Sequence, residues 1–184
     1  MTKRRGTALV NWFACFALAC SVLIAGTPQT ETDEILEGRI SQKDLSTRYA
    51  WFEDTKQKYM PDAGVVEALL PYSPELHFVV VMGTWCSDSR KQVPAFYSLM
   101  DALHISGKRI ELIGVDRQKR SGDVDVARLR IEYVPTFIVY YKGKEIGRIV
   151  ETPKVSLEED LLALLQTEGL TGHSSEPPKL AETH

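Results

Sequence analysis

The stretch from Phe78 to Arg90 constrains the fold of this chain more than any other. Residues Phe78 to Met82 are all apolar, which predicts a strand covered on both faces, as in a largely parallel sheet. Gly83 and Thr84 end this run, and a helix is predicted to begin at Cys86. That helix carries apolar residues at the 3.6-residue period: Val93, Phe96, Tyr97, Met100 and Leu103. The stretch therefore predicts a buried strand that leads through a short turn into an amphipathic helix.

Cys86 is the candidate reactive residue of this junction. Unpaired backbone N–H groups and the positive end of the helix dipole both favour a thiolate at such a position, which would lower the pKa of the thiol. Arg90 and Lys91 would act in the same direction and Asp88 against it, and we expect the cations and the dipole to prevail. The competing interpretation, a buried and inert core thiol, stays open.

The remaining chain predicts an alternating order of strands and helices. Strands are predicted over 35–40, 109–115, 136–141 and 145–150, and helices over 45–58, 65–70 (capped by Asp62) and 124–131. Ser156 and Glu159 form a predicted capping box for a last helix. We expect one domain over 35–168 with its core in 76–168, and a disordered polar tail over 169–184. The element order gives an α/β fold with a central mixed sheet and helices on both faces.

Three sequence features resemble the thioredoxin superfamily. Trp85-Cys86-x-x-Ser89 follows a buried strand, Pro94 lies eight residues beyond the cysteine, and Val134-Pro135-Thr136 precedes a later strand. The resemblance covers residues 76–150, and the additional elements before residue 76 resemble the extension of exported bacterial thioredoxin-like proteins. It implies a thioredoxin-like three-layer fold with an N-terminal strand and helix extension.

The resemblance also implies a substrate site around Cys86. Pro135 matches the proline that takes the cis form in this family and packs beside the reactive cysteine. The backbone of Val134 would then pair with an extended segment of a client as a short added strand. Trp85, Tyr133 and Pro135 would form the apolar rim of that site.

Ser89 stands where many relatives have a second cysteine. A hydroxyl cannot attack a mixed disulfide, and Val80 replaces the buried acid that usually assists the second thiol. We therefore expect isomerase-like monothiol exchange at Cys86 through mixed disulfides with client proteins or small thiols. Cys86 and Ser89 are the predicted residues of the catalytic motif. The alternative is a non-catalytic thioredoxin-like module that binds polypeptide and does not need Cys86.

Residues 1–26 have the pattern of a targeting segment. Three basic residues (3–5) precede an apolar run, and Ala17-Leu18-Ala19-Cys20 resembles a lipoprotein signal that would place lipid on Cys20. An uncleaved membrane anchor and cleavage near Gly26 are the other two interpretations, in that order after the lipoprotein. Residues 27–34 would form a tether. We expect export to the periplasm or cell envelope, where Cys86 is the one cysteine outside the targeting segment.

Charge and histidine spacing argue against two other classes of function. The net charge of −3 with no basic tract after the first residues gives no support for nucleic-acid binding. The four histidines are scattered and none lies at metal-ligand spacing from Cys86. We expect no metal and no cofactor.

Overall fold

The computed structural model of this 184-residue chain describes residues 34–122 and 124–169. The predictions for 1–26, for Cys20, for most of the 27–34 tether and for the tail from residue 170 lie outside these residues. Among the described residues, no helix is long and apolar enough to cross a membrane.

One five-stranded sheet runs through the molecule in the order β1-β3-β2-β4-β5. β2 pairs with β3 in parallel, and the other three pairings are antiparallel. The strands are β1 (Gly38–Ile40), β2 (Leu76–Met82), β3 (Ile110–Gly114), β4 (Thr136–Tyr141) and β5 (Lys144–Val150). β4 has the predicted bounds, whereas β1 begins three residues later than the predicted 35–40. The mixed sheet in an α/β fold is confirmed.

Helices lie between successive strands except in the hairpin of β4 and β5, and a last helix follows β5. The α-helices are α1 (Gln42–Arg48), α2 (Ala50–Lys58), α3 (Ala63–Leu69), α4 (Ser87–Ala102) and α5 (Leu157–Thr167), and the 3-10 helices are η1 (Leu70–Glu75), η2 (Gly107–Arg109) and η3 (Val126–Leu129). The predicted caps are present: the Asp62 carboxylate accepts from the Val65 N–H at 3.0 Å, and the Ser156 hydroxyl accepts from the Glu159 N–H at 3.2 Å.

The single helix predicted over 45–58 is wrong, because the chain is extended at Tyr49 (φ −129°, ψ 111°). Ser41 and Asp44 form a capping box that starts α1 earlier than predicted. The Tyr49 ring is buried and its hydroxyl donates to the Glu34 carbonyl. A tertiary contact of the break residue therefore divides one amphipathic pattern into two helices.

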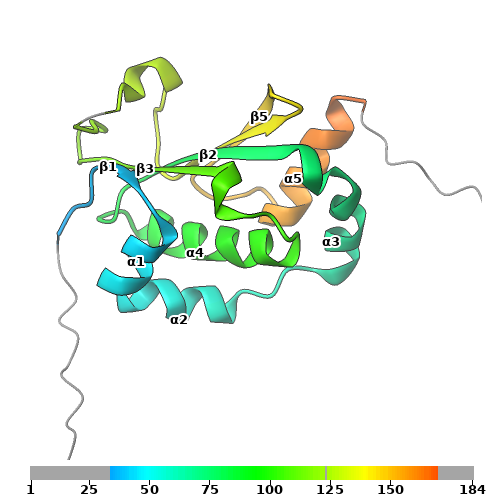
Figure 1. Cartoon of the computed structure of the whole chain (residues 1–184), viewed down its shortest axis with the longest axis horizontal. Coiled ribbons are helices and arrows are strands. Elements are labelled where there is room, and N and C mark those ends of the chain that lie inside the picture. Colours follow the sequence, from blue (N-terminus) through cyan, green and yellow to red (C-terminus); the bar gives the residue numbers. More distant parts are fainter. Residues whose placement is uncertain (1–33, 123, 170–184) are drawn as a thin grey trace, which may run out of the picture.

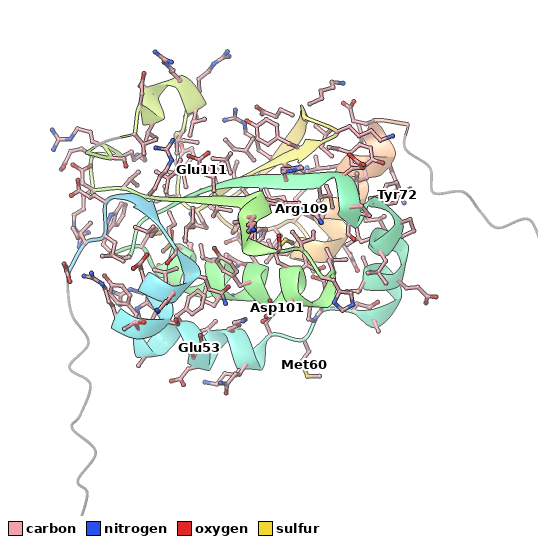
Figure 2. The ribbon with its side chains drawn as sticks, in the orientation of Figure 1. Glu53, Met60, Tyr72, Asp101, Arg109 and Glu111 are labelled. Atoms are coloured by element: carbon pink, nitrogen blue, oxygen red, sulfur yellow. The ribbon has the colours of Figure 1, made fainter. Side chains whose placement is uncertain are left out.

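The two faces of the sheet have separate hydrophobic cores. Phe78 and Val80 of β2 pack into the larger core with residues of all five α-helices, whereas Val79 and Val81 point to a smaller core on the other face. Figure 1 shows α1, α2 and α4 below the sheet and the segment that carries η3 rising on the opposite side. An ion pair of 2.7 Å between Lys56 and Asp101 ties α2 to α4, and Figure 2 labels Asp101 at this junction.

The second helical layer is thinner than predicted. In place of a helix over 124–131 there is only η3, which ends where Arg130 adopts a left-handed conformation (φ 51°). The long helix α4 ends at Ala102, and His104 turns the chain with φ 55°. The thioredoxin-like sheet is thus flanked by α-helices on one face and by a 3-10 helix with its loop on the other.

Candidate active site

Cys86 is the N-cap residue of α4, directly after the turn that follows β2. Its backbone N–H donates to the Gly83 carbonyl (3.0 Å), and its carbonyl accepts from the Arg90 N–H (3.0 Å). The side chain is half-buried, and Cys86 is the one free cysteine of the described residues. These bonds fix the sulfur at the start of the helix while leaving part of it accessible.

The Cys86 thiol is directed at the backbone before β4. Its sulfur lies 3.2 Å from the Val134 carbonyl oxygen, to which the S–H donates. The Val134–Pro135 peptide bond is cis, the form that the resemblance implies. The sulfur makes no capping bond to the N–H groups of α4, so the contact expected from the helix start is replaced by one to the neighbouring loop.

Ser89 holds the turn and does not contact the sulfur. It is 0% exposed, and its hydroxyl accepts from the buried Gly83 N–H at 3.2 Å. This is its one hydrogen bond with described residues. Ser89 therefore connects the first turn of α4 to the end of β2, two segments that determine where Cys86 lies.

Trp85 is anchored beside the cysteine. Its indole N–H donates to the Val115 carbonyl at 2.9 Å, and the Arg117 guanidinium carbon lies 5.2 Å from the ring centroid. A Cβ on Gly83 would stand 2.6 Å from the ring, so the absence of a side chain there lets the indole lie against the turn. A cation above a fixed aromatic ring thus borders the site.

Arg90 and Asp88 do not bond to the sulfur. The Arg90 Nε donates to the Thr84 carbonyl at 2.6 Å, and its guanidinium carbon lies 5.8 Å from the centroid of the Trp51 ring. Asp88 is half-buried on the first turn of α4 and has no ion pair within residues 34–122 and 124–169. The Arg90 guanidinium therefore stabilises the turn before α4 and is not directed at Cys86.

The expected apolar rim is only partly present. Tyr133 is 52% exposed and Trp85 is half-buried, as a rim requires, whereas Pro135 is buried. The reason is that Pro135 lies between two strands: it directly precedes β4, and its carbonyl accepts from the Glu151 N–H (2.7 Å) just beyond β5. Val134 is also buried and presents its carbonyl to Cys86.

A groove that the sequence did not indicate begins at Tyr133 and runs along the segment after β3. It has a volume of about 930 Å³, its lining spans residues 118–133, and Cys86 does not line it. Lys119 and Arg130 of this lining, and Arg117 beside it, form no ion pair with any described residue. The sequence feature that could have indicated this groove is the concentration of basic residues over 117–130, which the net charge of the whole chain does not reveal.

Within the described ranges, no group of three histidine, cysteine or carboxylate side chains comes together that could hold a metal ion. Two tyrosines on the helical side of the sheet have clearly raised pKa values. Burial, followed by the hydrogen bond to Glu158, raises the pKa of Tyr59 well above its usual value, and burial does the same for Tyr97. These groups stay protonated and do not titrate near neutral pH.

The sequence matches no family model and no curated protein. Similar solved structures include a protein of unknown function from Pseudomonas aeruginosa (21% identity over 65% of this chain and 73% of that one, TM-score 0.44). Chlamydomonas reinhardtii thioredoxin f2 (17% identity, 58% and 94%, TM-score 0.39) and Fasciola hepatica thioredoxin (20% identity, 60% and 93%, TM-score 0.33) are also similar. At these TM-scores the matches say nothing about activity, and the fold follows from the strand order and pairing described above.

Proposed function

We propose that this protein is a thiol-disulfide exchange protein that acts through the single cysteine Cys86. One observation carries the proposal: the half-exposed Cys86 sulfur at the start of α4 lies against the Val134 carbonyl, in the loop before β4. A thiol in this place is open to a second sulfur from solvent and has a backbone edge beside it to align an extended client segment. An inert core thiol would be sealed on all sides, and this one is not.

The chemistry is a balanced exchange. The Cys86 thiolate attacks one sulfur of a client disulfide, the S–S bond breaks, a Cys86–client disulfide forms, and the second client sulfur leaves as a thiolate that takes up a proton. Ser89 cannot displace the client, since it is a buried hydroxyl that is bonded to Gly83. Attack on the client's bridging sulfur by another cysteine of the client restores Cys86 and leaves a rearranged disulfide. This isomerisation needs no net oxidant or reductant.

The test uses the full-length chain and a model protein with scrambled disulfides. Recovery of the model protein's native activity is expected to exceed that with an equal concentration of free cysteine, and Cys86→Ala is expected to abolish the difference. Cys15→Ala with Cys20→Ala is the matched control, because it removes the other two cysteines and leaves Cys86. Equal rates for the natural chain and for free cysteine would exclude the proposal.

A second candidate function is a non-catalytic polypeptide-binding module. It is favoured by the groove over 118–133, which is large enough for a peptide segment and is not lined by Cys86. In that case a client captured by the natural chain would be retained equally by Cys86→Ala. Exchange activity and client retention in the same variant therefore separate the two functions.

We also infer, from the residues of the first 26 positions alone, that the protein is exported and tethered in the cell envelope. A fusion of residues 1–34 to a reporter that is active only after export is expected to be active. Incorporation of labelled fatty acid that Cys20→Ala abolishes would favour the lipoprotein over the anchor. An inactive fusion would refute export.

A further inference from the structure

A second cavity lies on the helical side of the sheet, away from the 118–133 groove. It is formed by the end of α2, the first half of α4 and the segment after β5, and has a volume of about 330 Å³. Such a volume lies at the small end of the range for small-molecule sites, roughly 300–1,000 Å³. We name it the α2–α4 pocket; its lining includes Lys58, Tyr59, Lys91, Gln92, Ala95 and Pro153.

Gln92 is the unusual residue of this pocket. It is 5% exposed, yet its carboxamide makes no hydrogen bond with any described residue. The other buried polar side chains of the described chain each have a hydrogen-bond partner: Thr84, Ser89, Ser121, Thr136 and Glu158. The hydrogen-bonding groups of this amide are therefore left for a molecule from outside the protein, water or a ligand.

The Gln92 amide is not sealed inside the core. Within the described residues, Trp51 Nε1 is the side-chain polar atom that is closed off from solvent and has no hydrogen-bond partner. The amide oxygen and nitrogen of Gln92 are not in this condition. Gln92 is one of the residues that line the α2–α4 pocket. A side-chain amide offers two N–H donors and a carbonyl acceptor, which match the carbonyl and N–H of a peptide group.

Two cations border the same pocket. Lys58 and Lys91 are exposed, line the cavity and form no ion pair with described residues. Glu158, the buried carboxylate nearby, does not line the pocket and already accepts from the Tyr59 hydroxyl (2.5 Å) and from the Asp62 N–H (3.0 Å). Glu158 therefore already has two hydrogen-bond donors and pairs with neither lysine, so both ammonium groups are available to an anion at the opening.

We propose that the α2–α4 pocket binds a small peptide-like acid. Lys58 and Lys91 bind its carboxylate, Gln92 pairs with the adjoining amide group, and Ala95 and Pro153 contact its apolar part. The site is non-covalent and does not depend on Cys86, so it stands whether or not the cysteine exchanges disulfides. Lys91 and Gln92 belong to the helix that Cys86 begins, about 8–9 Å of helix rise beyond it.

The probe is N-acetyl-alanyl-alanine, which has a free carboxylate, compared with its neutral carboxamide. Both are titrated into the full-length, nitrogen-15-labelled chain and followed by NMR. The acid is expected to shift the Gln92 side-chain amide saturably, and the carboxamide is expected to bind at least about five-fold more weakly, since it lacks the charge that the lysines bind. The shifted resonances are expected to cluster on α2, the first half of α4 and residues 152–156.

Substitutions of the pocket residues test the role of each side chain in binding. Lys58→Gln and Lys91→Gln are each expected to weaken acid binding by roughly three- to ten-fold and to leave carboxamide binding unchanged. Lys154→Gln is the matched control, because Lys154 is exposed between the lining residues Pro153 and Val155 but does not itself line the pocket. Gln92→Met, which keeps the length without the amide, is expected to weaken both probes.

Three results would overturn the proposal. One is the absence of a saturable shift up to about 50 mM probe, and another is equal binding of the acid and the carboxamide. The third is an effect of Lys154→Gln as large as that of Lys58→Gln, which would indicate general attraction to surface charge. If Gln92→Met does not fold, the exposed lysine variants still decide the outcome.

Discussion

Ser89→Ala tests whether the serine of the Cys-x-x-Ser motif is a structural residue. Its hydroxyl is the acceptor for the Gly83 N–H, at 3.2 Å, in a place where both residues are buried. Removing the acceptor leaves a buried backbone donor unpaired, which costs about 1–3 kcal/mol. The methyl group of alanine fills nearly the same space, so the lost hydrogen bond dominates the expected change in the free energy of unfolding.

The assay is urea unfolding of the full-length chain, followed by tryptophan fluorescence. With a urea dependence of about 2 kcal/mol per molar, a loss of about 2 kcal/mol lowers the unfolding midpoint by about 1 M. Ser87→Ala is the matched control: Ser87 is exposed on the same helical turn and has no hydrogen bond to a described side chain. Amide hydrogen exchange at Gly83 is expected to accelerate in Ser89→Ala only.

A loss below about 0.5 kcal/mol in Ser89→Ala, or an equal loss in Ser87→Ala, would refute this reasoning. The same argument applies to Ser89→Cys, because a thiol is a weak acceptor for the Gly83 N–H. We expect that variant to be less stable than the natural chain even while it supplies a second sulfur near Cys86. The monothiol motif would then have a structural reason as well as a chemical one.

Two further predictions concern the packing of the sheet and the loss of stability at alkaline pH. Gly114→Ala is expected to destabilise the fold by several kcal/mol in thermal unfolding, because a Cβ there would stand 2.2 Å from the Leu36 carbonyl oxygen. Gly107→Ala is the control in the same assay, since a Cβ at Gly107 meets nothing within 4 Å. Because the pKa of Tyr59 is raised above its usual 10.0, its contribution to stability is fully present below pH 10 and is lost as the pH rises beyond it. Tyr59→Phe is expected to reduce that alkaline loss in unfolding measured from pH 8 to 11; an unchanged slope would assign the loss to other groups such as the buried Tyr97.

Local patterns in the sequence predicted the parts of the fold that depend on neighbouring residues. The apolar run before Gly83 and the amphipathic pattern after Cys86 placed β2 and α4, and the apolar run after Pro135 gave the bounds of β4. Asp62 and Ser156 were predicted as helix caps because a capping bond spans only three residues. These interactions are complete within one turn or one strand, so the sequence by itself determines them.

Contacts between distant segments decided the rest. The bond from Cys86 to Val134 spans 48 residues, and Tyr49 breaks a continuous helical pattern through its contact with Glu34. Arg90 was expected to act on the thiol, but its guanidinium is bound by the Thr84 carbonyl. The unpaired amide of Gln92 has no signal in the sequence, since on the helical pattern it reads as one more polar residue of α4. Burial and hydrogen-bond partners depend on which segments meet in space, and only the tertiary structure determines them.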